Sequence, residues 1–141
     1  MVPSDPHDAA VLVVDDDPIF AALAVTCLSR AGLRTASASD GVEALDILQV
    51  QRFDVLLVDL DMPKIDGFRL IALLRGMPKL DSLAIMVVSG TRDPAAYEEA
   101  LGLGADTFLT KPVEWGLLPV RARFILKRRE WTSHRSQSQV A

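Results

Sequence analysis

The stretch LLVDLDMPKIDG, Leu56–Gly67, starts as an apolar run and breaks on two acids, Asp59 and Asp61, before a Met-Pro turn. A short apolar run bounded by turn residues predicts a buried strand. A strand that ends in carboxylates can lead into an ordinary polar loop. It can also present the nucleophile of a phosphatase, or an aspartate that accepts a phosphoryl group and holds it. The residues around the stretch decide between these interpretations.

Short apolar runs alternate with amphipathic segments along the whole chain. Strands are predicted over 10–14, 33–39, 54–58, 83–89 and 106–110, and helices over 18–32, 40–49, 68–76, 93–104 and 113 to about 129. In the first helix the apolar residues at helical spacing are Ile19, Phe20, Leu23, Cys27 and Leu28. Strands that alternate with helices favour a doubly wound α/β fold, with a parallel sheet and helices on both faces.

The composition is that of a single soluble domain. Half of the 141 residues are hydrophobic and 24% are charged. The single cysteine, Cys27, excludes an internal disulfide and fits the reducing cytoplasm. No apolar run approaches the roughly 20 residues of a membrane span, so no membrane association is expected.

Charge is spread unevenly over the chain. Six basic residues and one acid, Glu130, lie in residues 121–141, which gives 6 − 1 = +5 against a net charge of −4 for the whole chain. Direct binding to nucleic acid is not expected, because the body is acidic and no helix-turn-helix or zinc finger follows. Residues 1–8 are predicted to be a flexible N-terminus, and residues 128–141 a basic, polar and disordered tail.

Polar side chains follow most of the predicted strands. They are Asp15, Asp16 and Asp17 after the first strand, Asp59 and Asp61 after the third, Ser89 at the end of the fourth, and Lys111 after the fifth. The carboxyl ends of parallel strands share one edge of the sheet, where ligands bind. Clustered carboxylates repel one another unless a cation is present, and oxygen donors without histidine or cysteine favour Mg²⁺. Together with Lys111 and Ser89, such a site suits a phosphoryl group.

Four motifs resemble a known family. VLVVDDDP (11–18), LLVDLDMPKIDGF (56–68), IMVVSG (85–90) and FLTKPV (108–113) are similar, in order and spacing, to the receiver domains of bacterial two-component response regulators. The resemblance covers roughly residues 9–127. It implies a flavodoxin-like (βα)5 fold with a five-stranded sheet in the order 2-1-3-4-5.

The resemblance also implies roles for single residues. Asp59 corresponds to the phosphoacceptor, Asp16 to a direct Mg²⁺ ligand and Asp15 to a ligand through water, while Asp61 lends its backbone carbonyl to the metal. Lys111 pairs with the phosphoryl group, and a cis peptide bond is expected before Pro112.

Further positions concern switching and signal lifetime. Ser89 corresponds to the switch hydroxyl and Phe108 to the switch aromatic, while Asp61 and Thr91 occupy the two variable positions that tune phosphoryl lifetime. The chain departs from the usual pattern by having Gly90 in place of alanine and Phe108 in place of the commoner tyrosine. The first departure loosens the loop that carries Ser89.

The implied function is that of a switch. A histidine kinase or phosphotransfer protein donates the phosphoryl group, and the surface of the fourth helix, fifth strand and fifth helix then binds an effector protein, a fused output module or a second copy. The segment TKPVEWGLLPVRARFILKRR (110–129) resembles receivers that precede diguanylate cyclase or phosphodiesterase modules. The chain is expected to be no enzyme beyond catalysing its own phosphorylation and dephosphorylation.

The alternative is a phosphatase of the haloacid dehalogenase type, with Asp59 as nucleophile and Asp61 as general acid. In that class the Asp-x-Asp pair usually belongs to the first strand and is followed by threonine or valine. Here the pair follows the third strand and precedes Met62-Pro63, and the acids at 15–17 would have no role. The receiver interpretation is therefore favoured.

Overall fold

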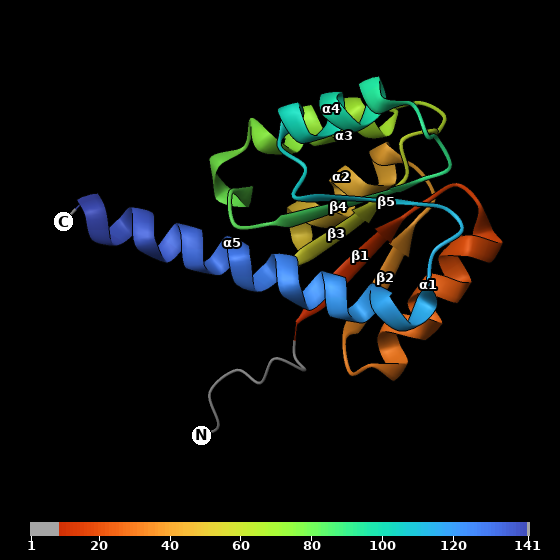
Figure 1. Cartoon of the computed structure of the whole chain (residues 1–141), viewed down its shortest axis with the longest axis horizontal. Helices are drawn as coiled ribbons and strands as arrows, with labels where there is room; N and C mark the ends of the chain where they lie inside the picture. Colours follow the sequence, from red (N-terminus) through yellow and green to blue (C-terminus); the bar gives the residue numbers. More distant parts are fainter. Residues whose placement is uncertain (1–8, 141) are drawn as a thin grey trace.

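Five parallel strands form the centre of the molecule (Figure 1). The computed structural model describes residues 9–140. The strands are β1 (Ala10–Val14), β2 (Arg34–Ala38), β3 (Val55–Val58), β4 (Ala84–Ser89) and β5 (Thr107–Thr110). Their order is β2-β1-β3-β4-β5, which confirms the predicted fold and the strand order.

Helices cover both faces of the sheet. They are α1 (Pro18–Arg30), α2 (Gly41–Val50), α3 (Gly67–Arg75), α4 (Pro94–Leu103) and α5 (Leu118–Val140), with two short 3-10 helices, η2 (Pro78–Leu80) and η3 (Trp115–Leu117). Figure 1 shows α1 and α5 on one face and α2, α3 and α4 on the other. Among the described residues, no helix is both long and apolar enough to cross a membrane.

The three central strands are buried on both faces, as their continuous apolar sequences predict. Every residue of β1, β3 and β4 is buried. Because side chains alternate along a strand, Val11 and Val13 join the core under α1 and α5, while Leu12 and Val14 join the core under α2, α3 and α4. The sheet is therefore a rigid platform whose strand ends carry the polar loops.

Helix α1 buries only part of the stripe that its spacing predicts: Phe20 and Leu28 are buried and Cys27 is partly buried, but two other members are exposed. Ile19 and Leu23 are 71% and 51% exposed, whereas the buried residues are Phe20, Ala21, Ala24 and Leu28. Alanine side chains let a helix approach the sheet closely, so the face rich in small residues packs inward. Phe20 is the large residue of the predicted stripe that turns toward the carboxyl end of the sheet.

Helix α5 also differs from the prediction at both ends. Its α-helical part begins at Leu118 after the 3-10 turn η3, instead of at residue 113. Pro119 explains the start, because proline is tolerated in the first turn of a helix but not in its interior. The helix then continues to Val140, beyond the expected end near Arg129, and projects past the sheet in Figure 1. No glycine or proline follows Pro119 to stop it. The tail predicted for residues 128–141 is thus helical as far as Val140, and the N-terminus predicted to be flexible lies outside the described residues.

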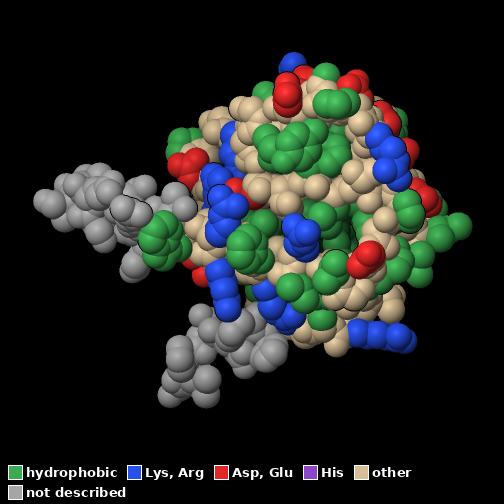
Figure 2. Space-filling view, in the orientation of Figure 1, with side chains coloured by type: hydrophobic (Ala, Val, Ile, Leu, Met, Phe, Trp, Pro, Cys, Tyr) green, Lys and Arg blue, Asp and Glu red, His purple; other side chains and the backbone are tan. Residues whose placement is uncertain are grey.

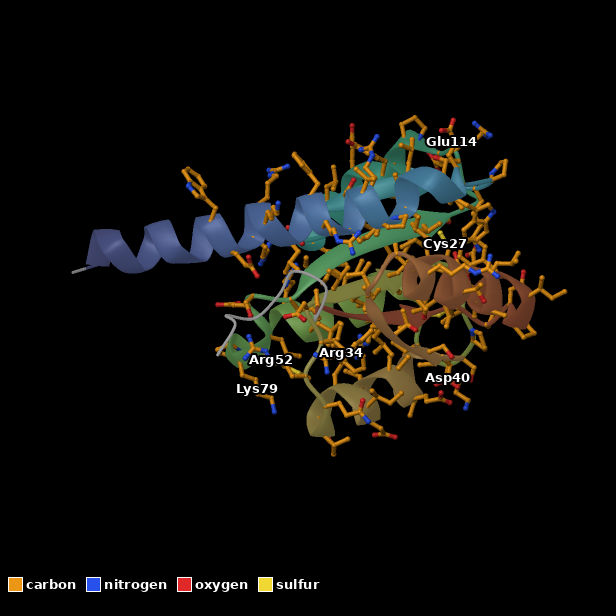
Figure 3. All side chains as sticks on the ribbon, turned by 90° about the horizontal axis from the view of Figure 1, so that it is seen from below. Cys27, Arg34, Asp40, Arg52, Lys79 and Glu114 are labelled. Atoms are coloured by element: carbon orange, nitrogen blue, oxygen red, sulfur yellow. The ribbon has the colours of Figure 1, made fainter. Side chains whose placement is uncertain are left out.

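The two ends of the sheet differ in character. Figure 3 shows Arg34, Arg52 and Lys79 at one end of the molecule and Asp40 and Glu114 at the other. The second end is where the strands finish, because Arg34 begins β2 and Asp40 follows it. The acidic loops therefore gather at the carboxyl edge of the sheet, the edge at which ligands bind in folds of this class.

Candidate functional site

Three carboxylates meet at the carboxyl edge of β1 and β3. Oxygen atoms of Asp15, Asp16 and Asp59 all lie within 4.8 Å of one another. The strand ladder brings them together, because the Asp59 N–H donates to the Val14 carbonyl at 3.0 Å, one residue beyond the end of β3. Asp15 and Asp59 are buried, and Asp16 is exposed. This oxygen-only donor set fits Mg²⁺, which prefers one or two carboxylates and retains several waters.

The loop between β1 and α1 holds the first two acids in place. The Asp17 N–H donates to Asp15 Oδ1 at 2.9 Å, and the Asp17 side chain accepts from the Ile19 N–H at 3.0 Å as the N-cap of α1. Asp17 is therefore the helix cap, as its position before Pro18 predicts. Two of the three adjacent acids belong to the cluster, and the third positions the helix that follows.

Lys111 supplies a positive charge from the end of β5. Its Nζ lies 2.9 Å from Asp15 Oδ2 and 3.7 Å from Asp59 Oδ2. The side chain of Asp15 has no exposed surface, so the ammonium compensates a fully buried carboxylate. The Lys111 N–H also donates to the Ser89 carbonyl at 2.8 Å, and the Lys111–Pro112 peptide bond is cis, as predicted.

The electrostatics of Asp59 differ from those of an ordinary surface acid. Burial raises the pKa of its carboxyl group, and the charge of Asp15 acts in the same direction. The ammonium of Lys111 opposes both effects. Removing a carboxylate from water destabilises its charged form, and a nearby carboxylate adds repulsion. The site therefore holds an excess of negative charge that a divalent cation would neutralise.

Gly67 allows the loop after β3 to close tightly beneath Asp59. A Cβ atom at this position would lie 2.4 Å from the Asp59 carbonyl oxygen and 2.7 Å from the Leu60 Cα. The Gly67 N–H donates to the Leu60 carbonyl at 2.9 Å, and Asp66 caps α3 by accepting from the Arg69 N–H. Asp61 is exposed, and its N–H points to Asp59 Oδ1 at 3.5 Å. The segment 59–67 is thus shaped by backbone contacts that a larger residue at 67 would break.

Ser89 ends β4 on the other side of Asp59's strand. It is fully buried, and its hydroxyl accepts from the Thr91 N–H at 3.3 Å. The Thr91 hydroxyl accepts in turn from the Asp93 N–H at 3.3 Å. Gly90 between them faces open space, because a Cβ atom there would meet nothing within 4 Å. The structure therefore shows no steric reason for glycine at position 90.

An acidic trio, a bridging lysine and a cis proline at the carboxyl edge of a β2-β1-β3-β4-β5 sheet match a known family. Residues 11–123 match the family described as "Response regulator receiver domain". The chain belongs to the response regulator receiver family. Such receivers are signal-accepting modules of two-component systems, so the predicted class of function is confirmed, and the haloacid dehalogenase-type alternative is not supported.

Relatives of this receiver occur both in regulators and in kinases. The chain is 36% identical over 128 residues to the Transcriptional regulatory protein AfsQ1 of Streptomyces coelicolor, which covers 91% of this chain and 55% of AfsQ1. It is 38% identical over 112 residues to the Sensor histidine kinase RcsC of Escherichia coli, covering 78% of this chain and 11% of RcsC. The chain thus spans about half the length of AfsQ1 and a small part of RcsC.

A solved structure of similar size gives the same picture of the fold. The chemotaxis response regulator CheY4 of Vibrio cholerae superimposes with a TM-score of 0.79 at 30% identity. The superposition covers 84% of this chain and 99% of the CheY4 chain. The receiver fold therefore accounts for nearly all of CheY4, whereas in AfsQ1 and RcsC it matches only part of a longer protein.

Phe108 of β5, which the sequence predicts to be the switch aromatic, contacts Tyr97 of α4. Its ring is half-buried on the side of the sheet that carries α2, α3 and α4. The ring centroid lies 5.5 Å from that of Tyr97, with the planes at 54°. Tyr97 was not singled out from the sequence, where one tyrosine in a helix has no partner to identify it. Together the two rings link β5 to the exposed face of α4.

Two other aromatic residues of the site were missed as site residues. Phe20 lies under Lys111, whose Nζ is 4.1 Å from the ring centroid, and the Phe20 ring is 5.3 Å from the ring of Trp115. Trp115 packs against the core under α1 and α5, as its apolar surroundings predict. The contact of Phe20 with Lys111 joins residues 91 positions apart, and nothing in either local sequence indicates it.

Proposed function

We propose that Asp59 accepts a phosphoryl group from a phosphohistidine of a histidine kinase or phosphotransfer protein. In this step an Asp59 carboxylate oxygen attacks phosphorus, an oxygen–phosphorus bond forms, and the bond from phosphorus to the histidine nitrogen breaks. The observation that carries the proposal is the buried Asp59 beside Asp15 and Asp16, with the Lys111 ammonium 3.7 Å away. The chain acts catalytically on itself alone.

The metal of this reaction is Mg²⁺, held directly by Asp16 and Asp59, by the backbone carbonyl of Asp61, and by Asp15 through water. When bound, Mg²⁺ supplies positive charge that offsets the carboxylates and the oxygens of the phosphoryl group. Lys111 contributes a second positive charge from β5, and it binds a phosphoryl oxygen. The hydroxyl of Ser89 binds a further phosphoryl oxygen, which couples phosphorylation to the loop after β4.

Phosphorylation changes the surface formed by α4, β5 and α5, where a partner binds. Binding of the phosphoryl group by Ser89 re-packs the loop before α4, and Phe108 follows into the space near Ser89, which shifts a balance between two conformations. Contact of the Phe108 and Tyr97 rings supports this route from β5 to α4. Figure 2 shows hydrophobic and basic side chains next to one another over α5. Val120, Phe124 and Trp131 are exposed there.

The partner on this surface is an effector protein, a fused output module or a second copy of the chain. The receiver unit is residues 9–127, with the remainder of α5 as its connection to such a partner. A diguanylate cyclase or phosphodiesterase module remains a prediction from the segment 110–129. The location that belongs to this proposal is the cytoplasm, where a kinase domain would meet the receiver.

Intact-mass measurement after incubation with acetyl phosphate and Mg²⁺ tests the proposal. The wild-type chain is expected to gain one phosphoryl group, and Asp59→Asn to gain none. The adduct should be absent when EDTA replaces Mg²⁺. An Asp66→Asn variant is a matched control, because Asp66 is exposed and only caps α3. Turnover of unrelated phosphate esters without an adduct would contradict the receiver mechanism and favour a phosphatase.

Asp61 and Thr91 set the lifetime of the aspartyl-phosphate in this proposal. Asp61 adds an exposed carboxylate two residues from Asp59, and Thr91 donates its N–H to Ser89. We expect Asp61→Asn and Thr91→Ala each to change the first-order decay of the adduct after the phosphodonor is removed. Decay constants equal to that of the wild-type chain would show that neither side chain tunes the lifetime.

A further inference from the structure

The ammonium of Lys111 lies over the face of the Phe20 ring, with Nζ 4.1 Å from the ring centroid. The same Nζ is 2.9 Å from Asp15 and 3.7 Å from Asp59. Only the contact with Asp15 is a hydrogen bond. A cation within about 6 Å of a ring centroid is attracted by the negative face of the ring, and more strongly where water is excluded. Phe20 is buried at 9% exposure, so this contact is largely shielded from solvent.

The loop that carries the acid cluster also places the ring. Phe20 lies in the first turn of α1, whose start is determined by the Asp17 cap and by Pro18. Asp15 accepts from the Asp17 N–H in the same loop. The ring therefore reaches Lys111 from the segment that presents Asp15 and Asp16, and its position relative to the carboxylates is determined by a few backbone contacts.

Trp115, before α5, contacts the Phe20 ring, and Cys27 of α1 holds Trp115 in place. The ring of Trp115 lies 5.3 Å from that of Phe20, with an interplanar angle of 40°. The Cys27 thiol donates to the Trp115 carbonyl at 3.1 Å, and burial raises the pKa of this thiol, which keeps the donor protonated. Figure 3 shows Cys27 on α1 where that helix faces the segment leading into α5. Helix α1 thus supplies both the ring and the contact that holds its neighbour.

The ring attracts the ammonium without competing for a proton or a metal. An ammonium that hydrogen-bonded to Asp59 would reduce the ability of that carboxylate to attack phosphorus. Asp15 and the Phe20 face together account for where the ammonium lies, and they leave 3.7 Å between Nζ and Asp59. An aliphatic side chain would fill the same core position but would offer the cation no such attraction.

We propose that Phe20 is a positioning residue that, together with Asp15, holds the Lys111 ammonium ready for the incoming phosphoryl group while leaving Asp59 free to react. This inference rests on the proposed function of Asp59. Phe20 acts through Lys111 and does not touch the phosphoryl group itself. The contact strengthens the site only through the charge distribution of the ring, so it can be weakened without changing the shape of the side chain.

Fluorinated phenylalanines at position 20 test this proposal in the full chain. Incorporation of 4-fluoro-, 3,5-difluoro- and 3,4,5-trifluorophenylalanine withdraws electron density from the ring face in steps while its size stays nearly constant. The rate constant of phosphorylation by acetyl phosphate at saturating Mg²⁺ is measured by intact mass. The free energy of unfolding is measured by urea denaturation. Trifluorophenylalanine at Phe53, which is half-buried and packs against the core on the other face of the sheet, is the matched control.

We expect the rate constant to fall with each fluorine step, by about twofold to fivefold over the series, which is the range given by the usual strength of such contacts. The free energy of unfolding should stay constant over the series, and the Phe53 control should react at the wild-type rate. Phe20→Leu should react as slowly as the trifluoro variant, and Phe20→Tyr, which keeps the electron-rich face, should retain most of the rate.

The outcomes separate this inference from the proposed function. No adduct on the wild-type chain would overturn the proposed function of Asp59 and this inference with it. An adduct on the wild-type chain with a rate that does not change over the fluorine series would overturn the role of Phe20 alone and leave it as core packing. A fall in rate that only accompanies a matching loss of stability would likewise overturn the positioning role.

Discussion

Lys111 is ion-paired with Asp15 more closely than with Asp59, at 2.9 Å against 3.7 Å. Asp15 has no exposed side-chain surface, so its charge depends on this one ammonium among the described side chains. The lysine therefore has a structural role before any phosphoryl group arrives. It holds a buried like-charge pair together at the end of the sheet.

Replacing Lys111 should destabilise the chain when no divalent cation is present. Lys111→Met leaves Asp15 and Asp59 without a positive partner, and breaking such a pair typically costs about 3 kcal/mol or more, reduced here because Lys111 is partly exposed. We expect the free energy of unfolding in EDTA to fall by about 2 kcal/mol, and added Mg²⁺ to restore part of the loss. Urea denaturation at neutral pH measures both.

Lys64→Met is the control for the loss of a lysine. Lys64 pairs with Asp40 at 3.2 Å, but its side chain is 64% exposed. Exposed pairs contribute about 0–1 kcal/mol, so a small change is expected. Equal losses for the two lysine variants would show that Lys111 stabilises no more than a surface charge does.

The charge on Asp59 should oppose folding. Burial raises the pKa of Asp59 in the folded chain. The folded state therefore holds this proton more tightly than the unfolded state does. Protonation of Asp59 therefore contributes to the free energy of unfolding. This contribution is fully present below the ordinary pKa of an aspartate, and it is lost as the pH rises through the raised pKa of Asp59 in the folded chain. Asp59→Asn should then be more stable than the wild-type chain at neutral pH in EDTA.

The pH dependence provides the check on Asp59. The difference in free energy of unfolding between Asp59→Asn and the wild-type chain should grow as the pH is raised from acid to neutral, and Mg²⁺ should reduce it. Asp61→Asn, which removes an exposed carboxylate two residues away, should leave stability nearly unchanged. Parallel profiles for the wild-type chain and Asp59→Asn would contradict a destabilising Asp59 charge.

The convergence of the acids and the lysine was predictable because it follows from topology. Continuous apolar runs such as Val55–Val58 indicate strands buried on both faces, and such strands are parallel in α/β folds. Once the strands are parallel, residues that directly follow them must share one edge. Asp15, Asp59 and Lys111 were therefore identifiable from their places in the chain.

The aromatic support of the site was not predictable in this way. Which face of α1 turns inward depends on packing against the sheet, and the structure chooses the alanine-rich face with Phe20 over Ile19 and Leu23. The extent of α5 was missed for a different reason. Its start was predicted at residue 113, because the role of Pro119 in the first turn was overlooked. Its continuation to Val140 follows from the lack of a breaker, which is a weak signal in a polar segment.

A methyl group at position 67 should force apart the loop that positions Asp59. The new Cβ would lie 2.4 Å from the Asp59 carbonyl oxygen, which is backbone and cannot rotate away. We expect Gly67→Ala to lower the free energy of unfolding by about 1–3 kcal/mol, as overpacking usually does, and to slow phosphorylation by acetyl phosphate. Urea denaturation and intact mass measure the two effects.

Gly90→Ala is the matched control, because it is the same substitution next to the same site. A Cβ there meets nothing within 4 Å, and the backbone φ of Gly90 is not positive. Stability should change by no more than about 0.5 kcal/mol. If Gly67→Ala were tolerated as well as Gly90→Ala, the tight closure of the loop would not matter for the position of Asp59.

A second ionic cluster, at the opposite edge of the sheet, fastens α5 to the body. Asp106 accepts from Arg75 Nη2 at 3.1 Å, from Arg129 Nη1 at 2.9 Å and from the Ile85 N–H at 2.7 Å. Burial lowers the pKa of Arg75, and the neighbouring Arg129 acts in the same direction. Part of the basic charge near the end of the chain is therefore used internally, by Arg129 on Asp106 and by Arg123 on the Ala31 carbonyl.

Replacing Asp106 should lower the free energy of unfolding far more than replacing Arg129. Asp106→Asn leaves the Arg75 guanidinium, whose side chain is only 12% exposed, facing Arg129 without the carboxylate to which it is hydrogen-bonded. We expect a loss of about 3 kcal/mol in the free energy of unfolding. Arg129→Met loses one ion pair but also relieves the repulsion of Arg75, so a loss of about 1 kcal/mol or less is expected.

A double-mutant cycle distinguishes this cluster from a set of independent contacts. With Arg129 already replaced, Asp106→Asn removes the carboxylate partner of Arg75 alone. The double variant should therefore lose less stability than the sum of the two single variants. Arg121→Met, at an exposed position of α5, should change little. Strict additivity, or an Asp106→Asn loss as small as that of Arg129→Met, would show that the two guanidiniums do not share Asp106 as the geometry indicates.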